Sequence, residues 1–193
     1  MSYRKLAVWM ILMMIVWLMG GGCTETVPAG SDAPGRRAED ISQPNLAPAN
    51  NKVTLKVYFA TKDALYLVPE TVTIDKPANP AQSAMELLMA GPKNKDLLPV
   101  ISPVAKLISI KVKDKVAYVN FSEKLKKENP GGSTNEILTI GAIVNTLTEF
   151  PEIKKVQILI EGKVVQTLSG HLDISEPLSR SEGIIKQPDS KKK

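Results

Sequence analysis

The sequence is short of the residues that most often build a reactive or metal-binding centre. Its 193 residues include one cysteine and one histidine, and aromatic residues make up 5% of the chain. A single cysteine excludes an intrachain disulfide, and one cysteine with one histidine cannot supply a Cys/His zinc site. The length allows one domain, or two small ones. We therefore expect a modest core without disulfides, and neither a metal site nor a cofactor.

Apolar residues are unevenly spread, because residues 6–19 form an uninterrupted apolar run. This run follows Arg4 and Lys5 and ends at three glycines before Cys23. A basic start, an apolar stretch of 14 residues and an exit of small residues are the three parts of a secretory signal. The run is also short for a membrane span, which takes about 20 residues in a helix. Residues 1–22 are therefore predicted to be a signal peptide.

The position of the only cysteine predicts lipid attachment. The signal resembles that of bacterial lipoproteins, in which the cysteine becomes the mature N-terminus and carries acyl chains such as palmitate on its sulfur and amine. Gly21 and Gly22 fit that pattern, whereas Gly20 stands where leucine is usual. We expect acylation of Cys23, with an uncleaved N-terminal helix as the alternative anchor. Either anchor holds the rest of the chain outside the cytoplasmic membrane, and two or more acyl chains would make it stable.

The formal net charge of +5 is distributed over the whole chain. Residues 1–22 carry +2, and residues 52–174 carry 16 Lys/Arg against 13 Asp/Glu, which gives +3. Interspersed charges of both signs are typical of an ordinary soluble surface, and so small an excess is weak support for nucleic-acid binding. We expect no nucleic-acid partner, and we interpret the terminal lysines, residues 191–193, as solvated.

Composition divides the exported part into three segments. Residues 24–51 are rich in Pro, Ala, Gly, Ser, Asp and Asn and show no period of 2 or 3.6. Together with Cys23 they predict a flexible tether, residues 23–51, that spans on the order of 30 Å. Residues 52–174 predict one folded domain. Residues 175–193 are polar and contain two prolines, which predicts a disordered tail.

The pattern of the predicted domain is that of an α+β fold. Alternating apolar residues favour strands near residues 52–60, 65–74, 106–112, 116–121, 156–160 and 163–168. Apolar residues at helical spacing favour helices over residues 80–90 and 133–150. The predicted order is ββαββαββ, with two helices packed on one face of a single, mainly antiparallel or mixed sheet.

Both predicted helices begin with a capping signal. Asn79 precedes Pro80, and Gln82 follows three positions after Asn79, which predicts an N-cap, a first-turn proline and a capping-box partner. Ser133 and Glu136 form an S-x-x-E pair, which predicts a capping box for the second helix.

A tight hairpin is predicted at residues 113–115, where Lys115 would take a positive φ that suits glycine better. Pro69 should mark an edge strand or a bulge. A sheet covered on one face leaves a free face and free edges, which pair with other domains by strand addition or packing. The residues expected on the free face are Lys56, Tyr58, Lys111 and Gln157.

The sequence contains few clusters of residue types that could form a catalytic centre. His171 lies near Ser169 and Asp173, the residue types of a hydrolase triad, but the chain has no G-x-S-x-G motif and nothing that marks an oxyanion hole. The more ordinary role for His171 is to end a strand or to form a local hydrogen bond. We therefore expect no catalytic residue and no enzyme activity.

Two loop clusters have an ordinary interpretation beside a functional one. Gly131-Gly132-Ser133 at a helix start could hold an anion, but the P-loop spacing and its lysine are missing, which favours a flexible capped loop. The nearby glutamates lack metal-ligand spacing, and the lysines beside them are interpreted as a solvated rim. These residues are Glu123, Glu128 and Glu136, and Lys124, Lys126 and Lys127.

A resemblance covers residues 53–178. It is carried, in order, by VYFATKDALYLVPE, AMELLMAGP, PVISP, KLISIKVKDKVAYVNFS, GGSTNEILTIGAIVNTLTEFPEIKKVQILIEGK and GHLDISEPL. These segments resemble the GerMN domain, the sporulation and spore germination domain of lipoproteins from Gram-positive bacteria. The resemblance implies a non-catalytic, extracytoplasmic module, similar in architecture to the ring-building domains of sporulation complexes. It carries over no reactive centre, and Asn145, Thr146 and Gly131-Gly132 are family-like positions without an assigned role.

The resulting hypothesis is an assembly or scaffold lipoprotein, lipid-anchored on the outer face of the cytoplasmic membrane of a Gram-positive-type bacterium and linked to sporulation or germination. Its expected partners are the membrane, through the lipid on Cys23, and another extracytoplasmic domain or a second copy. The alternative is a ligand-binding lipoprotein for a cell-wall fragment or small molecule, which needs a concave pocket of a few hundred cubic ångströms. A hydrolase built around His171 is the third hypothesis.

Overall fold

The computed structural model describes residues 51–187. The predicted signal peptide, Cys23 and nearly all of the tether lie outside the described residues, so these assignments stay predictions. Within residues 51–187, the helices are all too short or too polar to span a bilayer.

The strands of the described region form two sheets. The first is antiparallel, with strand order β2-β1-β3, and contains β1 (Lys52–Thr61), β2 (Leu67–Asp75) and β3 (Leu97–Leu98). The second has the order β4-β5-β6-β7, with β8 beside β6, and is mixed because β5 and β6 run parallel. Its strands are β4 (Leu107–Lys113), β5 (Val116–Phe121), β6 (Lys155–Ile160), β7 (Lys163–Val164) and β8 (Leu178–Ser179).

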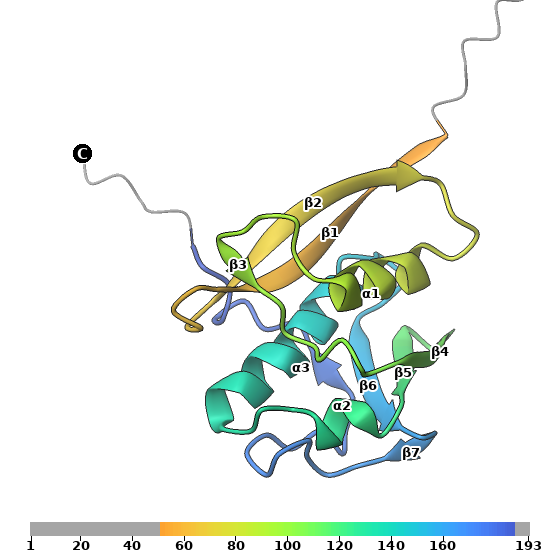
Figure 1. Cartoon of the computed structure of the whole chain (residues 1–193). Helices are drawn as coiled ribbons and strands as arrows, with labels where there is room; N and C mark the ends of the chain where they lie inside the picture. Colours follow the sequence, from red (N-terminus) through yellow and green to blue (C-terminus); the bar gives the residue numbers. More distant parts are fainter. Residues whose placement is uncertain (1–50, 188–193) are drawn as a thin grey trace, which may run out of the picture. The chain divides into compact units, whose positions relative to one another are not determined.

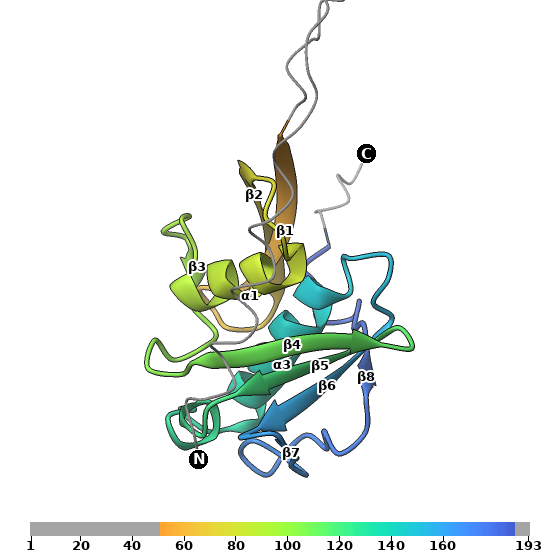
Figure 2. The ribbon, with the colours of Figure 1, turned by 90° about the vertical axis from the view of Figure 1, so that its right-hand side faces the viewer.

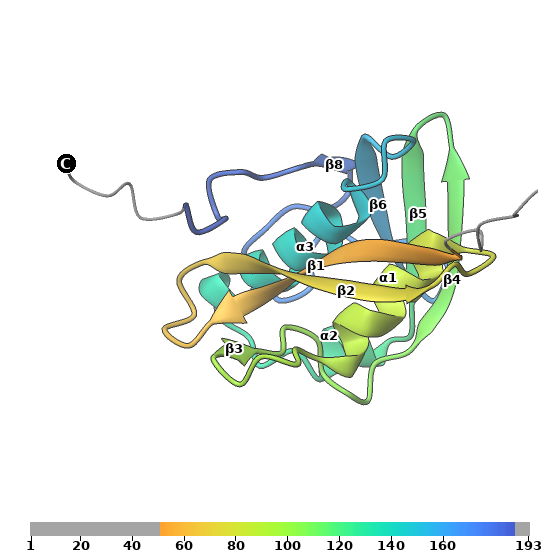
Figure 3. The ribbon, with the colours of Figure 1, turned by 90° about the horizontal axis from the view of Figure 1, so that it is seen from above.

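The two long helices lie between the sheets. Helices α1 (Pro80–Ala90) and α3 (Ser133–Leu147) both contact β1, and they contact β4 and β6, respectively, on the other side. Figures 1 and 3 show the β1–β2 hairpin passing over both helices, with β4, β5 and β6 beyond them. A short helix, α2 (Lys124–Lys127), precedes α3.

The α+β class is confirmed, but the prediction of a single sheet with both helices on one face is wrong. Every residue of α3 from Leu138 to Leu147 is buried, whereas one apolar stripe would bury about half of them. A helix that is buried all round needs cover on both sides. The β1–β2 hairpin supplies the second cover as a separate sheet. The predicted elements occur in the predicted order, with β3, α2 and β8 as short additions.

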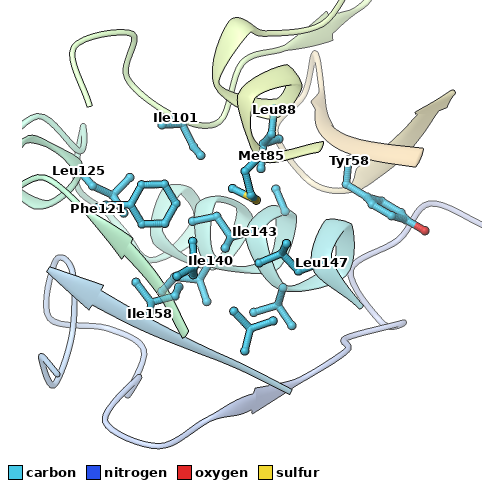
Figure 4. Packing of buried hydrophobic residues seen from close by; sticks show 14 of the residues in the cluster. Tyr58, Met85, Leu88, Ile101, Phe121, Leu125, Ile140, Ile143, Leu147 and Ile158 are labelled. Atoms are coloured by element: carbon cyan, nitrogen blue, oxygen red, sulfur yellow. The ribbon is translucent and has the colours of Figure 1, made fainter. Parts of the chain in front are cut away.

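The core is built around α3. Ile140, Ile143 and Leu147 are fully buried. Figure 4 shows these side chains between Met85 of α1 and Ile158 of β6. Because α1 and both sheets contact α3, groups that fix segments onto α3 contribute to the stability of the fold.

The predicted tail does not begin at residue 175, because residues 175–187 belong to the fold. Leu178 and Ser179 pair with Val156 and Lys155 of β6, and the backbone then crosses α3 to reach β2. There the N–H of Leu67 donates to the carbonyl of Ile184 at 2.7 Å, and the N–H of Lys186 donates to the carbonyl of Leu67 at 2.8 Å. We call residues 178–186 the strap, since they connect the two sheets across α3. Residues 188–193 lie outside the described residues.

The start of α1 follows the sequence signals closely. Asn79 Oδ1 accepts a hydrogen bond from the N–H of Gln82 at 3.1 Å, Pro80 occupies the first turn, and Gly91 ends the helix with a φ of 87°. The side chain of Gln82 donates to Glu86 instead of returning to Asn79, so only half of the predicted capping box forms.

The hairpin between β4 and β5 has the strained geometry that the sequence predicts. Asp114 and Lys115 connect the strands with φ values of 50° and 63°. Two consecutive positive φ values define a type I′ turn, in which a residue with a side chain is disfavoured relative to glycine. Pro69 lies on β2, the edge strand of its sheet, as predicted.

Replacing Lys115 by glycine should therefore stabilise the protein. We expect the free energy of unfolding to rise by about 0.5–1 kcal/mol, because relief of the left-handed strain outweighs the greater freedom of glycine in the unfolded chain. The control is Lys111→Gly in β4, where φ is not positive and glycine should lower the free energy by about 0.5–1 kcal/mol. Urea unfolding of both variants measures the difference, and equal destabilisation would contradict the strain argument.

Candidate functional site

Glu136 on α3 is a fully buried carboxylate and forms the first of two polar centres. Its Oε1 accepts hydrogen bonds from the N–H groups of Leu168 and Ser169, both at 2.9 Å. Its Oε2 accepts from the N–H of His171 at 2.8 Å and lies 3.1 Å from His171 Nδ1. One side chain therefore holds the loop of residues 168–171 against α3.

The pKa of Glu136 reflects two opposed effects. Burial alone raises it, but the three N–H donors of Ser169, His171 and Leu168, with the His171 ring, lower it below its ordinary value of 4.5. The carboxylate is therefore charged at neutral pH, and its charge is compensated by four hydrogen-bonding groups.

The prediction of a capping box at Ser133 and Glu136 is wrong. Gly132 is the N-cap, Ser133 is already helical, and the Glu136 side chain points to the 168–171 loop. The residues of the hydrolase alternative, His171, Ser169 and Asp173, do not form a triad, since the carboxylate of Asp173 accepts from the N–H and hydroxyl of Ser175 while His171 pairs with Glu136. The His171 ring therefore bonds to a residue 35 positions earlier in the chain and not to a local partner.

A second polar centre ties the strap to β1 and to the end of α3. The Tyr58 hydroxyl donates to Glu149 Oε1 at 2.6 Å and accepts from Arg180 at 2.6 Å. Arg180 also pairs with Glu149 at 2.9 Å and bonds to Glu182. Burial and the hydrogen bond to Glu149 raise the pKa of Tyr58 to about 12, so the hydroxyl stays protonated. Lys56 pairs with the other oxygen of Glu149 at 2.9 Å.

Two of the residues expected on a free sheet face are buried. Tyr58 lies in the centre just described, and Gln157 is covered by the chain near Ile174, whose carbonyl accepts from its side-chain amide at 2.9 Å. Lys56 and Lys111 are exposed, as predicted.

Asn145 and Thr146 are structural residues of α3. Asn145 pairs with the backbone of Ser181 through two hydrogen bonds of 2.9 Å, one donated and one accepted. Thr146 Oγ1 accepts from the N–H of Tyr58 at 3.2 Å, on the edge of β1 that faces α3. Both side chains are fully buried, so they join α3 to the strap and to β1.

The strap and its arginine were missed by the sequence interpretation. A signal was present in Ile184-Ile185, an apolar pair within an otherwise polar segment. In the structure both pack against the core, and Ile184 lies over Gly141, where an added Cβ would come within 2.2 Å of its Cδ1. Gly141 therefore makes room for the strap on α3.

Two lysines and two glutamates near the start of α3 form exposed ion pairs, as a solvated rim would, whereas the third glutamate, Glu136, is buried. Lys124 and Lys127 form exposed ion pairs with Glu128 and Glu123 at 3.1 and 2.9 Å. The N–H of Gly131 donates to Asn129, within the loop. Among residues 51–187, the acidic, cysteine and histidine side chains form no group that could hold a metal ion.

Exposed apolar side chains occur in the β1–β2 turn and on the neighbouring strand β3. Leu65, Tyr66 and Leu98 are 61%, 42% and 39% exposed, and we call these three residues the turn patch. Ala64 and Leu98 also line an adjoining hollow of about 310 Å³, together with the loop of residues 99–103. A second, mostly apolar hollow of about 280 Å³ lies between part of α3 and the strap.

Sequence comparisons relate the chain to proteins of sporulation. Residues 56–166 match the family model described as sporulation and spore germination. The chain is 28% identical over 142 residues to the spore germination protein GerM of Bacillus subtilis strain 168. That alignment covers 70% of this chain and 38% of GerM, so the chain spans well under half of this relative.

Solved structures show the same fold. The chain is similar to the first GerMN domain of the sporulation protein GerM from Bacillus subtilis, with a TM-score of 0.58 and 26% identity over 66% of this chain and 98% of that one. It is also similar to the tandem GerMN domains of GerM, with a TM-score of 0.56 and 25% identity over 75% of this chain and 51% of that one. One copy of the domain therefore corresponds to the described region.

Proposed function

The chain belongs to the sporulation and spore germination family and carries a GerMN domain, and from this membership we propose that it acts in sporulation or germination as an extracytoplasmic assembly module. In this proposal it is non-catalytic, is anchored by lipid on Cys23 to the outer face of the cytoplasmic membrane, and works through protein–protein contacts. The partner is another extracytoplasmic domain or a second copy of the chain.

The turn patch is the observation that carries the proposal. Three large apolar side chains are exposed in the β1–β2 turn and on β3, and apolar side chains that gather on one surface are typical of a site that another protein covers. The lowered pKa values of Glu136 and Glu149 support a structural rather than a chemical role for the polar centres. Glu136 fixes a loop and Glu149 fixes the strap, and both carboxylates are fully engaged in those contacts.

Charge introduced into the turn patch tests the proposal. We expect Leu65→Asp combined with Leu98→Asp to abolish self-association of the purified chain, or capture of a membrane partner in crosslinked cells, since buried unpaired carboxylates weaken an interface by several kcal/mol. Val164→Asp is the matched control, because Val164 is 53% exposed on β7, outside the patch. Wild-type chain that stays monomeric and captures nothing would contradict the assembly role.

Membrane retention tests the anchor separately. A Cys23→Ala variant should appear in the soluble fraction of cells, because the acyl chains that hold the mature protein would be missing. Unchanged retention would instead support the uncleaved N-terminal helix.

Ligand binding is the second candidate function, favoured by the hollow beside Leu98. Its volume of about 310 Å³ lies at the lower end of the range for small-molecule sites. Binding of cell-wall fragments at this site should raise the unfolding temperature of wild-type chain, and Leu98→Trp, which places a larger side chain at the wall of the hollow, should remove that shift.

A further inference from the structure

The second sheet presents a lysine-rich outer face. In β5, Ala117, Val119 and Phe121 are buried against the helices, so Val116 and Tyr118 point outward. Cross-strand pairing carries this alternation to the neighbouring strands. The outward neighbours of Val116 are Lys113 and Lys155, and the outward neighbour of Tyr118 on β4 is Lys111, all three exposed.

Two more lysines extend this face at its end. Lys115 lies in the hairpin turn, and its carbonyl accepts from the N–H of Lys154 at 2.7 Å, so the two residues are adjacent. We call the five residues the lysine face: Lys111, Lys113, Lys115, Lys154 and Lys155. The acidic residues nearest in sequence are Asp114 and Glu152. Among the ion pairs of residues 51–187, none involves a residue of the lysine face.

The lysine face is open over β4 and β5, whereas Gln157 on β6 is covered, and it includes one exposed aromatic side chain. Figure 2 looks onto β4, β5 and β6, with α3 behind them and α1 above β4. Tyr118 is 36% exposed on this face, directly beside Lys111 of β4. A tyrosine among lysines suits the boundary between lipid headgroups and water, where both residue types are favoured.

We infer that the lysine face docks on the anionic phospholipid headgroups of the membrane to which the chain is tethered. This inference rests on the tethering in the proposed function, because a tether of about 28 residues keeps the domain within some tens of ångströms of the bilayer. A high local concentration makes even a weak electrostatic contact effective. Lysines near an anionic surface each strengthen binding about fivefold, and a lipid anchor with a basic patch acts as a two-part membrane signal.

Vesicle sedimentation of the chain from residue 24 onward tests the inference without using the lipid. This segment is suitable for the assay, because the related first GerMN domain has been solved as a single domain. The match covers 98% of that domain. Circular dichroism checks the folding of the segment. We expect sedimentation with phosphatidylglycerol vesicles, loss of sedimentation in high salt, and none with phosphatidylcholine. The triple variant Lys111→Gln, Lys113→Gln, Lys155→Gln should bind on the order of a hundredfold more weakly.

The control variant removes the same charge elsewhere. Lys93, Lys95 and Lys126 are exposed and lie outside the lysine face, so replacing these three by glutamine should leave binding within about fivefold of wild type. Equal loss in both triple variants would show an effect of net charge and overturn the inference, as would equal sedimentation with both lipids. Binding to acidic proteins with no response to phosphatidylglycerol would also overturn it. Since this assay omits Cys23, its failure is distinct from failure of the anchor or of the turn patch.

Discussion

Replacing Glu136 by alanine is expected to lower the free energy of unfolding by about 3–5 kcal/mol. The buried carboxylate accepts from three backbone N–H groups and contacts one ring nitrogen, at Leu168, Ser169 and His171. Alanine leaves these donors without a partner in a buried position, and each unsatisfied group destabilises by about 1–3 kcal/mol. Partial opening of the loop to water keeps the total below the sum of the separate losses.

Glutamine at position 136 should give a smaller loss, about half that of alanine. Its amide oxygen can still accept from Leu168 and Ser169, but its NH₂ group would face the N–H of His171, a donor against a donor. Glu128→Ala is the control on an exposed glutamate, whose pair with Lys124 is exposed and should contribute less than 0.5 kcal/mol. Urea unfolding ranks the four proteins, and a Glu136→Ala loss as small as that of the control would refute the anchoring role.

Acidic pH should erase the advantage of wild type over Glu136→Gln. Since the pKa of Glu136 in the folded protein lies below its ordinary value of 4.5, the stabilisation is complete above about pH 4.5 and is lost as the pH falls through the folded-state pKa. Other carboxylates with lowered pKa values titrate in both proteins and cancel in the difference. A difference that is constant from pH 7 to pH 3 would show that the charge of Glu136 contributes nothing.

Local sequence patterns predicted the strands, the helix cap and the strained turn, because these features depend on residues close in sequence. The alternation around Val57 and Val119, the Asn79 cap and the positive φ of Lys115 depend on neighbours within a few positions. Periodicity also placed α3, but it could not show that both of its faces are covered. That depends on the β1–β2 hairpin, which forms its own sheet.

The polar centres could not be predicted in the same way, because their partners are distant in sequence. Glu136 bonds to residues 32 to 35 positions later, and the Ser133 spacing offered a plausible local partner that the structure does not use. Arg180 meets Tyr58 across 122 positions. A glutamate three residues after a serine is compatible with a cap and with a buried anchor, and only the position of the 168–171 loop decides between them.

Replacing Asn145 by alanine is expected to release the strap from α3 and lower the free energy of unfolding by about 2–4 kcal/mol. Alanine removes both hydrogen bonds to Ser181 and leaves its backbone N–H and carbonyl unpaired unless the strap moves into water. Movement of the strap would carry Arg180 away from Tyr58 and Glu149 and Ile184 away from Gly141. Without these contacts, the strap would connect the two sheets less firmly.

Hydrogen–deuterium exchange distinguishes strap release from a general loss of stability. In Asn145→Ala, the amides of Leu67, Ser181 and Lys186, which the strap protects, should exchange faster than the decrease in global stability explains. Asn135→Ala is the matched control on the same helix, because the Asn135 amide bonds to Gly131 at an exposed site and alanine is the better helix former. Uniformly faster exchange across the β4–β5 hairpin and the strap would mean that Asn145 stabilises the domain as a whole without holding the strap in particular.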